Sequence, residues 1–124
     1  MKHPGLWGRS ILVVEDELLI AMDIAGALEN AGAHPTMTTT VRHALILIEH
    51  DGLSGAIMDH ALSDGDSTAL CVRLKERGIP YLSYSGFSAV AGADPAAPHI
   101  TKPVHMDVLM SALEELLPRT PRRS

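Results

Sequence analysis

The sequence predicts a single α/β domain in which five parallel strands form one sheet that is covered by helices on both faces. Short runs of aliphatic and β-branched residues alternate along the chain with longer segments whose apolar residues recur at helical spacing. The short runs are mostly apolar throughout, which is typical of strands buried on both faces of a sheet. Alternating strands and helices favour a parallel sheet, because each helical crossover returns the chain to the same end of the sheet.

The expected elements follow one another in a regular order. The expected strands are the short apolar or β-branched runs at 10–14, 34–38, 55–59, 79–86 and 99–103. Helical spacing predicts helices within 17–32, 40–52, 67–78 and 105–117, and the first three of these end at glycines. The segment 87–98 contains Gly92, Pro95 and Pro98, so a helix between the fourth and fifth strands is expected to be short or degraded.

The apolar spacing also predicts which side of the first and last helices is buried. The expected buried residues of the first helix are Leu18, Met22, Ala25 and Leu28, and those of the last helix are Val108, Leu109, Ala112, Leu113 and Leu116. We also expect the methionines at positions 22, 37, 58, 106 and 110 to fill the core.

Length and charge exclude several classes of protein. The chain has 124 residues, of which 46% are hydrophobic, and this suits one domain with a substantial core. The formal net charge of −5 argues against nucleic-acid or membrane-surface binding, because both require a basic face. The chain has one cysteine, no apolar leader and no run of membrane-spanning length, so we expect a cytoplasmic protein.

Polar residues stand where the predicted strands end. Glu15 and Asp16 follow the first strand, Asp59 ends the third, Ser85 the fourth and Lys102 the fifth. The carboxyl ends of parallel strands lie at one edge of a sheet, so these groups are expected to converge. Two like charges 4 Å apart repel by about 4 kcal/mol at an effective dielectric near 20, and a hard cation such as Mg²⁺ would offset this repulsion. Asp59 is then a candidate nucleophile toward phosphorus, with Lys102 and Ser85 available to neutralise charge.

Four motifs together resemble the receiver domains of two-component response regulators. They are "VVEDE" after the first strand, "IMD" after the third, "PYLSYSGF" at the fourth and "TKP" at the fifth. The resemblance covers 10–117 and implies a flavodoxin-like, receiver-type fold, with 1–9 as an N-terminal extension and 118–124 as a basic flexible tail. "PYLSYSGF" is also similar to the Pro-Phe-x-Phe-Ala-Thr-Gly-Tyr motif of a subgroup of single-domain alphaproteobacterial receivers.

The resemblance implies a role for each polar group. Asp59 would be the phospho-acceptor, Ser85 the switch hydroxyl, and Lys102 the group that contacts the phosphoryl, usually beside a cis-proline. The implied Mg²⁺ ligands are the carboxylates of Glu15, Asp16 and Asp59 and the backbone carbonyl of Ala61.

The implied function is that of a stand-alone response regulator. A sensor histidine kinase or a histidine phosphotransfer protein would supply the phosphoryl group in a Mg²⁺-dependent reaction. The signal would then pass to an unknown downstream protein through protein contacts or phosphorelay. Such a domain is not an enzyme, because it catalyses only its own phosphorylation and slow dephosphorylation. Ala61 and Phe87 offer no polar group to orient a hydrolytic water, which predicts a long-lived phosphorylated state.

Other interpretations of the same residues fit the sequence less well. The main alternative is a pseudo-receiver that keeps the fold without being phosphorylated, and the presence of all five polar groups argues against it. A flavin-binding protein of this fold would need a phosphate loop where the chain has "EDE", and a haloacid-dehalogenase-type phosphatase would need an acid at Ala61. Glu17 is assigned to capping the first helix. Ser63 and His99 stand where the commoner receiver pattern has proline and an aromatic residue.

Overall fold

A five-stranded parallel sheet forms the centre of the molecule in the computed structural model, which describes residues 2–50, 52–59, 61–62, 65–86 and 97–118. The order across the sheet is β2-β1-β3-β6-β7. These strands are β1 (Ser10–Val14), β2 (His34–Thr38), β3 (Gly55–Met58), β6 (Tyr81–Ser85) and β7 (His99–Thr101). All five predicted strands are therefore confirmed, with ends that differ by at most two residues.

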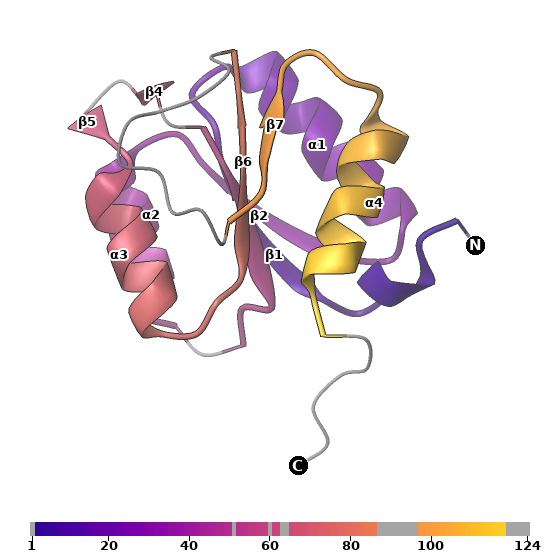
Figure 1. Cartoon of the computed structure of the whole chain (residues 1–124), viewed down its shortest axis with the longest axis horizontal. Helices are drawn as coiled ribbons and strands as arrows, with labels where there is room; N and C mark the ends of the chain where they lie inside the picture. The colour runs from indigo at the N-terminus through magenta and orange to yellow at the C-terminus, as the bar shows by residue number, and fades with distance from the viewer. Residues whose placement is uncertain (1, 51, 60, 63–64, 87–96, 119–124) are drawn as a thin grey trace.

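Helices cover both faces of the sheet (Figure 1). They are α1 (Leu18–Asn30), α2 (Val41–Leu47), α3 (Thr68–Glu76) and α4 (Met106–Leu116). Helices α1 and α4 lie on one face and α2 and α3 on the other (Figure 1), which makes the fold doubly wound as predicted. The predicted short or degraded helix between the fourth and fifth strands lies mostly at 87–96, outside the described residues.

The three central strands β1, β3 and β6 each contribute to two separate cores, because successive side chains point to opposite faces. In β1, Ile11 and Val13 belong to the core under α1 and α4, whereas Leu12 and Val14 belong to the core under α2 and α3. All four side chains are at most 1% exposed. Burying such a side chain contributes about 1.5–3 kcal/mol. Packing on both faces therefore stabilises the sheet and holds in place the polar residues at the carboxyl ends of its strands.

The buried side of α1 agrees with the prediction at Ala25 and Leu28 but not at Leu18 and Met22. Leu18 and Met22 are 60% and 52% exposed, and the residues that face the sheet include Ala21, Ile24 and Leu28. The first turns of this helix carry apolar residues on every side, so spacing alone could not fix the helix phase. The structure turns the smaller Ala21 toward the sheet and leaves the larger side chains outside.

Two other predicted core residues are also exposed. Val108 on α4 is 51% exposed and Met37 on β2 is 43% exposed. Strand β2 is the outermost strand on one side of the sheet, so it has a single neighbouring strand, β1. Pro35 of β2 pairs with Ile11 of β1. The preceding residue, His34, donates its N–H to Arg9 O at 2.7 Å.

Short elements complete the described fold. A 3-10 turn, η1 (Pro4–Leu6), precedes β1, and a small antiparallel pair, β4 (Ala61–Leu62) and β5 (Gly65–Asp66), follows β3. None of these was predicted. No helix in the described part of the chain combines the length and the apolar character of a membrane span.

Candidate functional site

Backbone hydrogen bonds fix the polar residues just beyond the strand ends. Asp59 N donates to Val14 O at 3.0 Å, Glu15 N donates to Thr38 O at 3.0 Å, and Lys102 N donates to Ser85 O at 2.7 Å. Each bond extends the ladder between neighbouring parallel strands by one residue. The predicted convergence of these residues at one edge of the sheet is therefore built into the backbone.

Three carboxylates form a compact cluster at this edge. Glu15, Asp16 and Asp59 each offer a carboxylate oxygen, and these atoms all lie within 4.8 Å of one another. Glu15 and Asp59 are buried, at 2% and 6% exposure, whereas Asp16 is more exposed. The cluster lies between β1 and β3, where the strand order reverses, and open α/β sheets bind ligands at this position.

Lys102 bridges two members of the cluster. Its Nζ lies 2.6 Å from Glu15 Oε1 and 3.0 Å from Asp59 Oδ2, and its side chain is 13% exposed. Burial disfavours the ammonium, but the hydrogen bonds to Glu15 and Asp59 outweigh burial and raise the pKa of Lys102. The lysine therefore stays charged and partly neutralises the two acids.

Glu15 is held from two directions and is deeply buried. Besides its bond to Lys102, its Oε2 accepts the backbone N–H of Glu17 at 3.1 Å. Burial raises the pKa of Glu15, with the nearby Asp59 charge acting in the same direction, while Lys102 and the Glu17 amide oppose the rise. A cation at the cluster would offset the cost of this buried charge.

The assignment of Glu17 to capping the first helix is confirmed in its position but not in its side chain. Glu17 does occupy the N-cap position of α1, but its side chain makes no capping hydrogen bond. Its contribution to the site comes from its backbone N–H, which points to Glu15 Oε2. Glu17 thus contributes to the cluster through its backbone N–H and not through its carboxylate.

Tyr84 is a site residue that the sequence did not reveal. The Lys102 ammonium lies 5.5 Å from the centre of the Tyr84 ring, and the Tyr84 hydroxyl accepts the Val104 N–H at 3.3 Å. A cation–π contact of this kind contributes about 0.5–1 kcal/mol. Tyr84 thus contacts the two residues that flank Pro103, Lys102 and Val104. The Lys102–Pro103 peptide bond is cis. The available signal was an aromatic residue one position before Ser85 on a strand beside that of Lys102.

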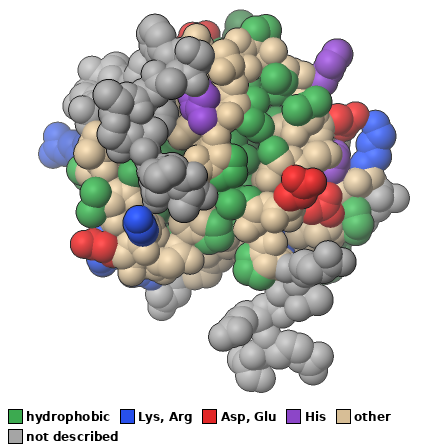
Figure 2. Space-filling model, in the orientation of Figure 1, with side chains coloured by type: hydrophobic (Ala, Val, Ile, Leu, Met, Phe, Trp, Pro, Cys, Tyr) green, Lys and Arg blue, Asp and Glu red, His purple; other side chains and the backbone are tan. Residues whose placement is uncertain are grey.

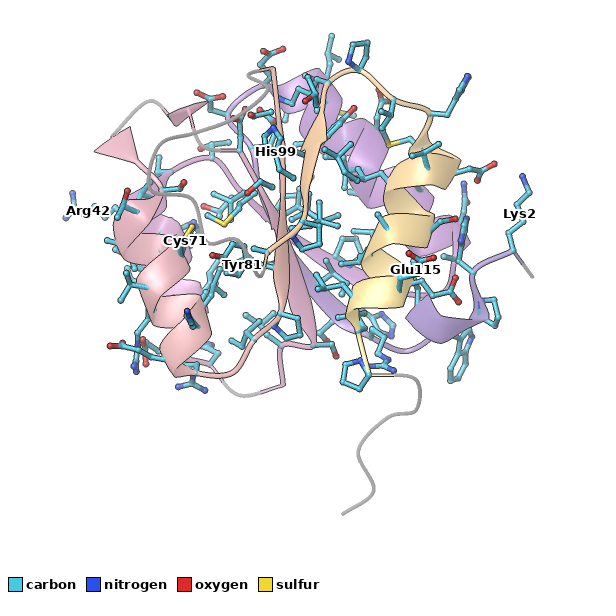
Figure 3. All side chains as sticks on the ribbon, viewed as in Figure 1. Lys2, Arg42, Cys71, Tyr81, His99 and Glu115 are labelled. Carbon is cyan, nitrogen blue, oxygen red and sulfur yellow. The ribbon has the colours of Figure 1, made fainter. Side chains whose placement is uncertain are left out.

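The remaining predicted residues are placed as follows. Ser85 is the last residue of β6 and is fully buried, opposite Thr101 of β7. Ala61 begins β4, two residues after Asp59, and its backbone pairs with Asp66. Their roles as switch hydroxyl and carbonyl ligand stay predictions. Of the other positions singled out, Ser63 and Phe87 lie outside the described residues, and His99 is half-buried on β7 (Figure 3).

The donor set fits a hard divalent cation. Mg²⁺ is bound through one or two carboxylates and keeps several waters, so it suits a cluster with two buried acids and one more exposed acid. Glu15, Asp16 and Asp59 would hold the ion, whose positive charge would replace part of the charge that Lys102 supplies. Carboxylates, an ammonium group and a buried hydroxyl at one sheet edge are the groups that phosphoryl transfer requires for positioning and charge neutralisation.

Comparisons with solved structures agree with this fold. The chain is 36% identical to SdrG from Sphingomonas melonis Fr1, covering 90% of this chain and 97% of that one with a TM-score of 0.77. A CheY-like response regulator receiver domain protein from Methanospirillum hungatei JF-1 is 27% identical, with 87% and 92% coverage and a TM-score of 0.77. The response regulator PhyR from Brucella abortus is 27% identical, with 92% and 50% coverage and a TM-score of 0.76.

The fold defines a response regulator receiver class of domain. The chain belongs to the receiver-domain family of two-component response regulators. Among curated proteins it is 31% identical over 121 residues to the transcriptional regulatory protein TcrA of Mycobacterium tuberculosis, which matches 92% of this chain. The chain spans about half the length of that relative, 48%. No family model matches the sequence. Membership of the alphaproteobacterial subgroup stays a prediction.

Proposed function

We propose that this receiver accepts a phosphoryl group on Asp59 and signals by presenting the changed surface to another protein. The observation that supports the proposal most directly is the placement of Asp59 beside both Glu15 and Lys102 at the strand-order reversal of the sheet. A buried carboxylate with an ammonium 3.0 Å away is restrained in position and partly neutralised. Both conditions favour attack by a carboxylate on an anionic phosphoryl group.

The proposed reaction transfers the phosphoryl group directly from donor to Asp59. A carboxylate oxygen of Asp59 forms a bond to phosphorus while the phosphorus–nitrogen bond of a phosphohistidine donor breaks and releases the donor's imidazole, or while the phosphorus–oxygen bond of acetyl phosphate breaks and releases acetate. Lys102 is already paired with Asp59 and is positioned to pair with a phosphoryl oxygen instead. When bound, Mg²⁺ supplies positive charge against the phosphoryl oxygens. Catalysis in this proposal is limited to the domain's own phosphorylation and slow dephosphorylation.

A protein donor is supported by the surface beside the site. Leu18, Leu19 and Met22 are 60%, 77% and 52% exposed on the first turns of α1, directly after the Glu15–Asp16 segment. Exposed apolar clusters of this kind mark protein interaction surfaces. We propose that a sensor histidine kinase or a histidine phosphotransfer protein binds here, which would bring its phosphohistidine to Asp59. A cytoplasmic location is part of this proposal, since such donors act there.

Phosphorylation by a small donor tests the proposal. The protein is incubated with acetyl phosphate and Mg²⁺, and intact mass and acid and base stability of the product are measured. We expect one acid-stable, base-labile phosphoryl group in the parent protein and none in Asp59→Asn. Asp23→Asn is the matched control, because Asp23 is an exposed aspartate on α1. Equal labelling of Asp59→Asn and parent would refute the assignment, and absence of labelling by any donor would favour the pseudo-receiver.

A further inference from the structure

Residues 2–9, here called the N-terminal strap, are attached to α1, to α4 and to Pro118 just after α4. Leu6 is fully buried in the core under α1 and α4. Gly8 N donates to Gly32 O at 2.8 Å, and Arg9 Nη2 donates to Pro118 O at 2.5 Å. Figure 1 shows the strap beside the lower part of α4, away from the carboxyl ends of the strands. The strap is therefore anchored on a part of the molecule that the acidic site does not use.

His3 is the polar centre of this attachment. Its side chain is 10% exposed and lies between two carboxylates of α4. Nε2 is 3.4 Å from Asp107 Oδ1, and Nδ1 is 3.5 Å from Glu114 Oε1. Buried Nδ1 has no hydrogen-bond partner among the described residues, although it faces that carboxylate. The imidazole thus has an acidic neighbour at each nitrogen.

The other groups around His3 keep this setting negative. On the strap itself, Lys2 Nζ lies 2.6 Å from Asp107 Oδ2 and, with His3, lowers the pKa of Asp107, so this acid stays charged. Glu114 also accepts the Gly5 N–H at 2.6 Å through Oε2. On the opposite side, α1 borders a cavity of about 380 Å³ beside His3 with uncharged residues, Ala27, Asn30 and Ala31. Figure 2 shows acidic side chains over α4 on the same face.

The protonation state of His3 decides how well it fits between these acids. A neutral imidazole carries one N–H, so one of its two nitrogens must present a lone pair to a carboxylate oxygen. The imidazolium carries an N–H on both nitrogens and can donate to Asp107 and Glu114 together. Histidine is the side chain that ordinarily changes charge between pH 5 and 8. Proton uptake by His3 would therefore remove an unfavourable contact and add a charge-assisted one.

We propose that the N-terminal strap is a proton-sensitive latch on α4, which tightens when His3 is protonated and loosens when His3 is neutral. The latch joins both ends of α4, because Asp107 lies in its first turn and Glu114 in its last. Loosening would free the strap from Glu114 and open the cavity between α1 and α4. The latch holds more tightly with the imidazolium than with the neutral imidazole, so alkaline conditions should weaken it.

Amide exchange along the strap tests the latch directly. Protection factors, which remove the intrinsic pH dependence of exchange, are measured for Gly5 and Leu6 at pH 5.5 and pH 8. We expect the parent protein to lose protection by about threefold to tenfold at pH 8, a range set by the strength of charge-assisted pairs. His3→Gln should show the same low protection at both values, and the exposed His50→Gln control should behave like the parent.

Fluorescence of Trp7 provides a second readout. Trp7 is the single tryptophan of the chain, and its ring lies so close to Gly32 that an added side chain there would collide with it. Trp7 is 64% exposed but packs against Gly32, so we expect the emission of the parent to change between pH 5.5 and 8 as this contact loosens, with no such change in His3→Gln. Equal pH dependence in parent and His3→Gln, or a strap that is more protected at pH 8, would overturn the proposal.

Discussion

Lys102 lies closer to Glu15 than to Asp59, with Nζ–oxygen distances of 2.6 Å and 3.0 Å. The ammonium and a divalent cation therefore compete for the same buried carboxylates. Lys102→Met removes this competitor, so we expect Mg²⁺ to bind on the order of tenfold more tightly. Phosphorylation by acetyl phosphate should slow on the order of 100-fold, because a charge that stabilises the phosphoryl group is lost.

Magnesium titration and labelling kinetics of Lys102→Met measure these two opposite effects. Lys75→Met, which changes an exposed lysine on α3, controls for the loss of one positive charge from the whole protein. Weaker Mg²⁺ binding in Lys102→Met would show that the lysine organises the cluster instead of competing for it.

Metal binding should stabilise the fold through the acidic cluster. At a Mg²⁺ concentration ten times its Kd we expect a gain of about 1.4 kcal/mol in the free energy of unfolding, which corresponds to about 4 °C in Tm for a domain of this size. Asp59→Asn should lose most of the gain, whereas Asp23→Asn should keep it. Thermal unfolding with and without Mg²⁺ gives the answer, and a gain that survives in Asp59→Asn would place the metal elsewhere.

The exposed start of α1 should be needed for a protein donor but not for a small one. Leu19→Glu places a charge on the most exposed residue of the α1 patch, at 77% exposure. We expect transfer from a cognate phosphorylated kinase to fall at least tenfold, since charge in an apolar contact is costly. Labelling by acetyl phosphate should be unchanged. Val72→Glu is the control, because Val72 is 53% exposed on α3, and an equal loss in both variants would count against the α1 surface.

An ion pair between α3 and the turn that follows α2 should give the domain an acid-sensitive contribution to stability. Arg73 Nε and Nη2 donate to Glu49 at 2.5 Å and 2.7 Å, and these bonds lower the pKa of Glu49 from 4.5 to about 2. A lowered pKa in the folded state means that this contribution is complete above about pH 4.5 and is lost as the pH falls toward 2. Glu49→Gln should therefore lose less stability on acidification than the parent.

Unfolding curves at pH 7, 4.5 and 3 measure this difference. Glu49 is exposed, so the effect should be modest and should shrink at high salt. Glu29→Gln, an exposed glutamate on α1, is the control. An acid response of Glu49→Gln equal to that of the parent would show that the pair adds nothing to stability.

The phosphorylated state is expected to last for minutes or longer. Ala61 lacks a polar group that could orient water near Asp59, and Phe87 is predicted to block its path. Loss of one positioning group slows such a step on the order of 10- to 100-fold. Decay of the purified phosphoprotein at neutral pH with Mg²⁺ measures the lifetime. The double change Ala61→Asn with Phe87→Glu should shorten it, and decay of the parent within seconds would contradict the prediction.

The sequence was most informative for strands that are buried on both faces of the sheet, because burial there requires an unbroken run of apolar residues. The residues that form β1 could be predicted because consecutive positions such as Ile11 and Leu12 face different cores and are both apolar. The convergence of Glu15, Asp59 and Lys102 followed in turn, since parallel strands end at one edge. No long-range contact had to be known for this step, only the order of the strands.

What could not be predicted depends on contacts between distant residues or on weak patterns. Tyr84 acts on Lys102 across two strands, and His3 reaches Asp107, 104 positions away. The phase of α1 was misjudged because apolar residues surround its first turns. Strands of two residues, such as β4, are too short to leave a periodic signal.

Pro35 limits what the β2 edge of the sheet can bind. Since His34 directs its N–H toward β1, the alternation of a strand turns the nitrogen of the next residue, Pro35, to the open side. That nitrogen carries no hydrogen, so an incoming strand from a second molecule would find a donor missing in the middle of the edge. The molecule is thereby protected against edge-to-edge aggregation along the five residues of β2, the outermost strand on this side.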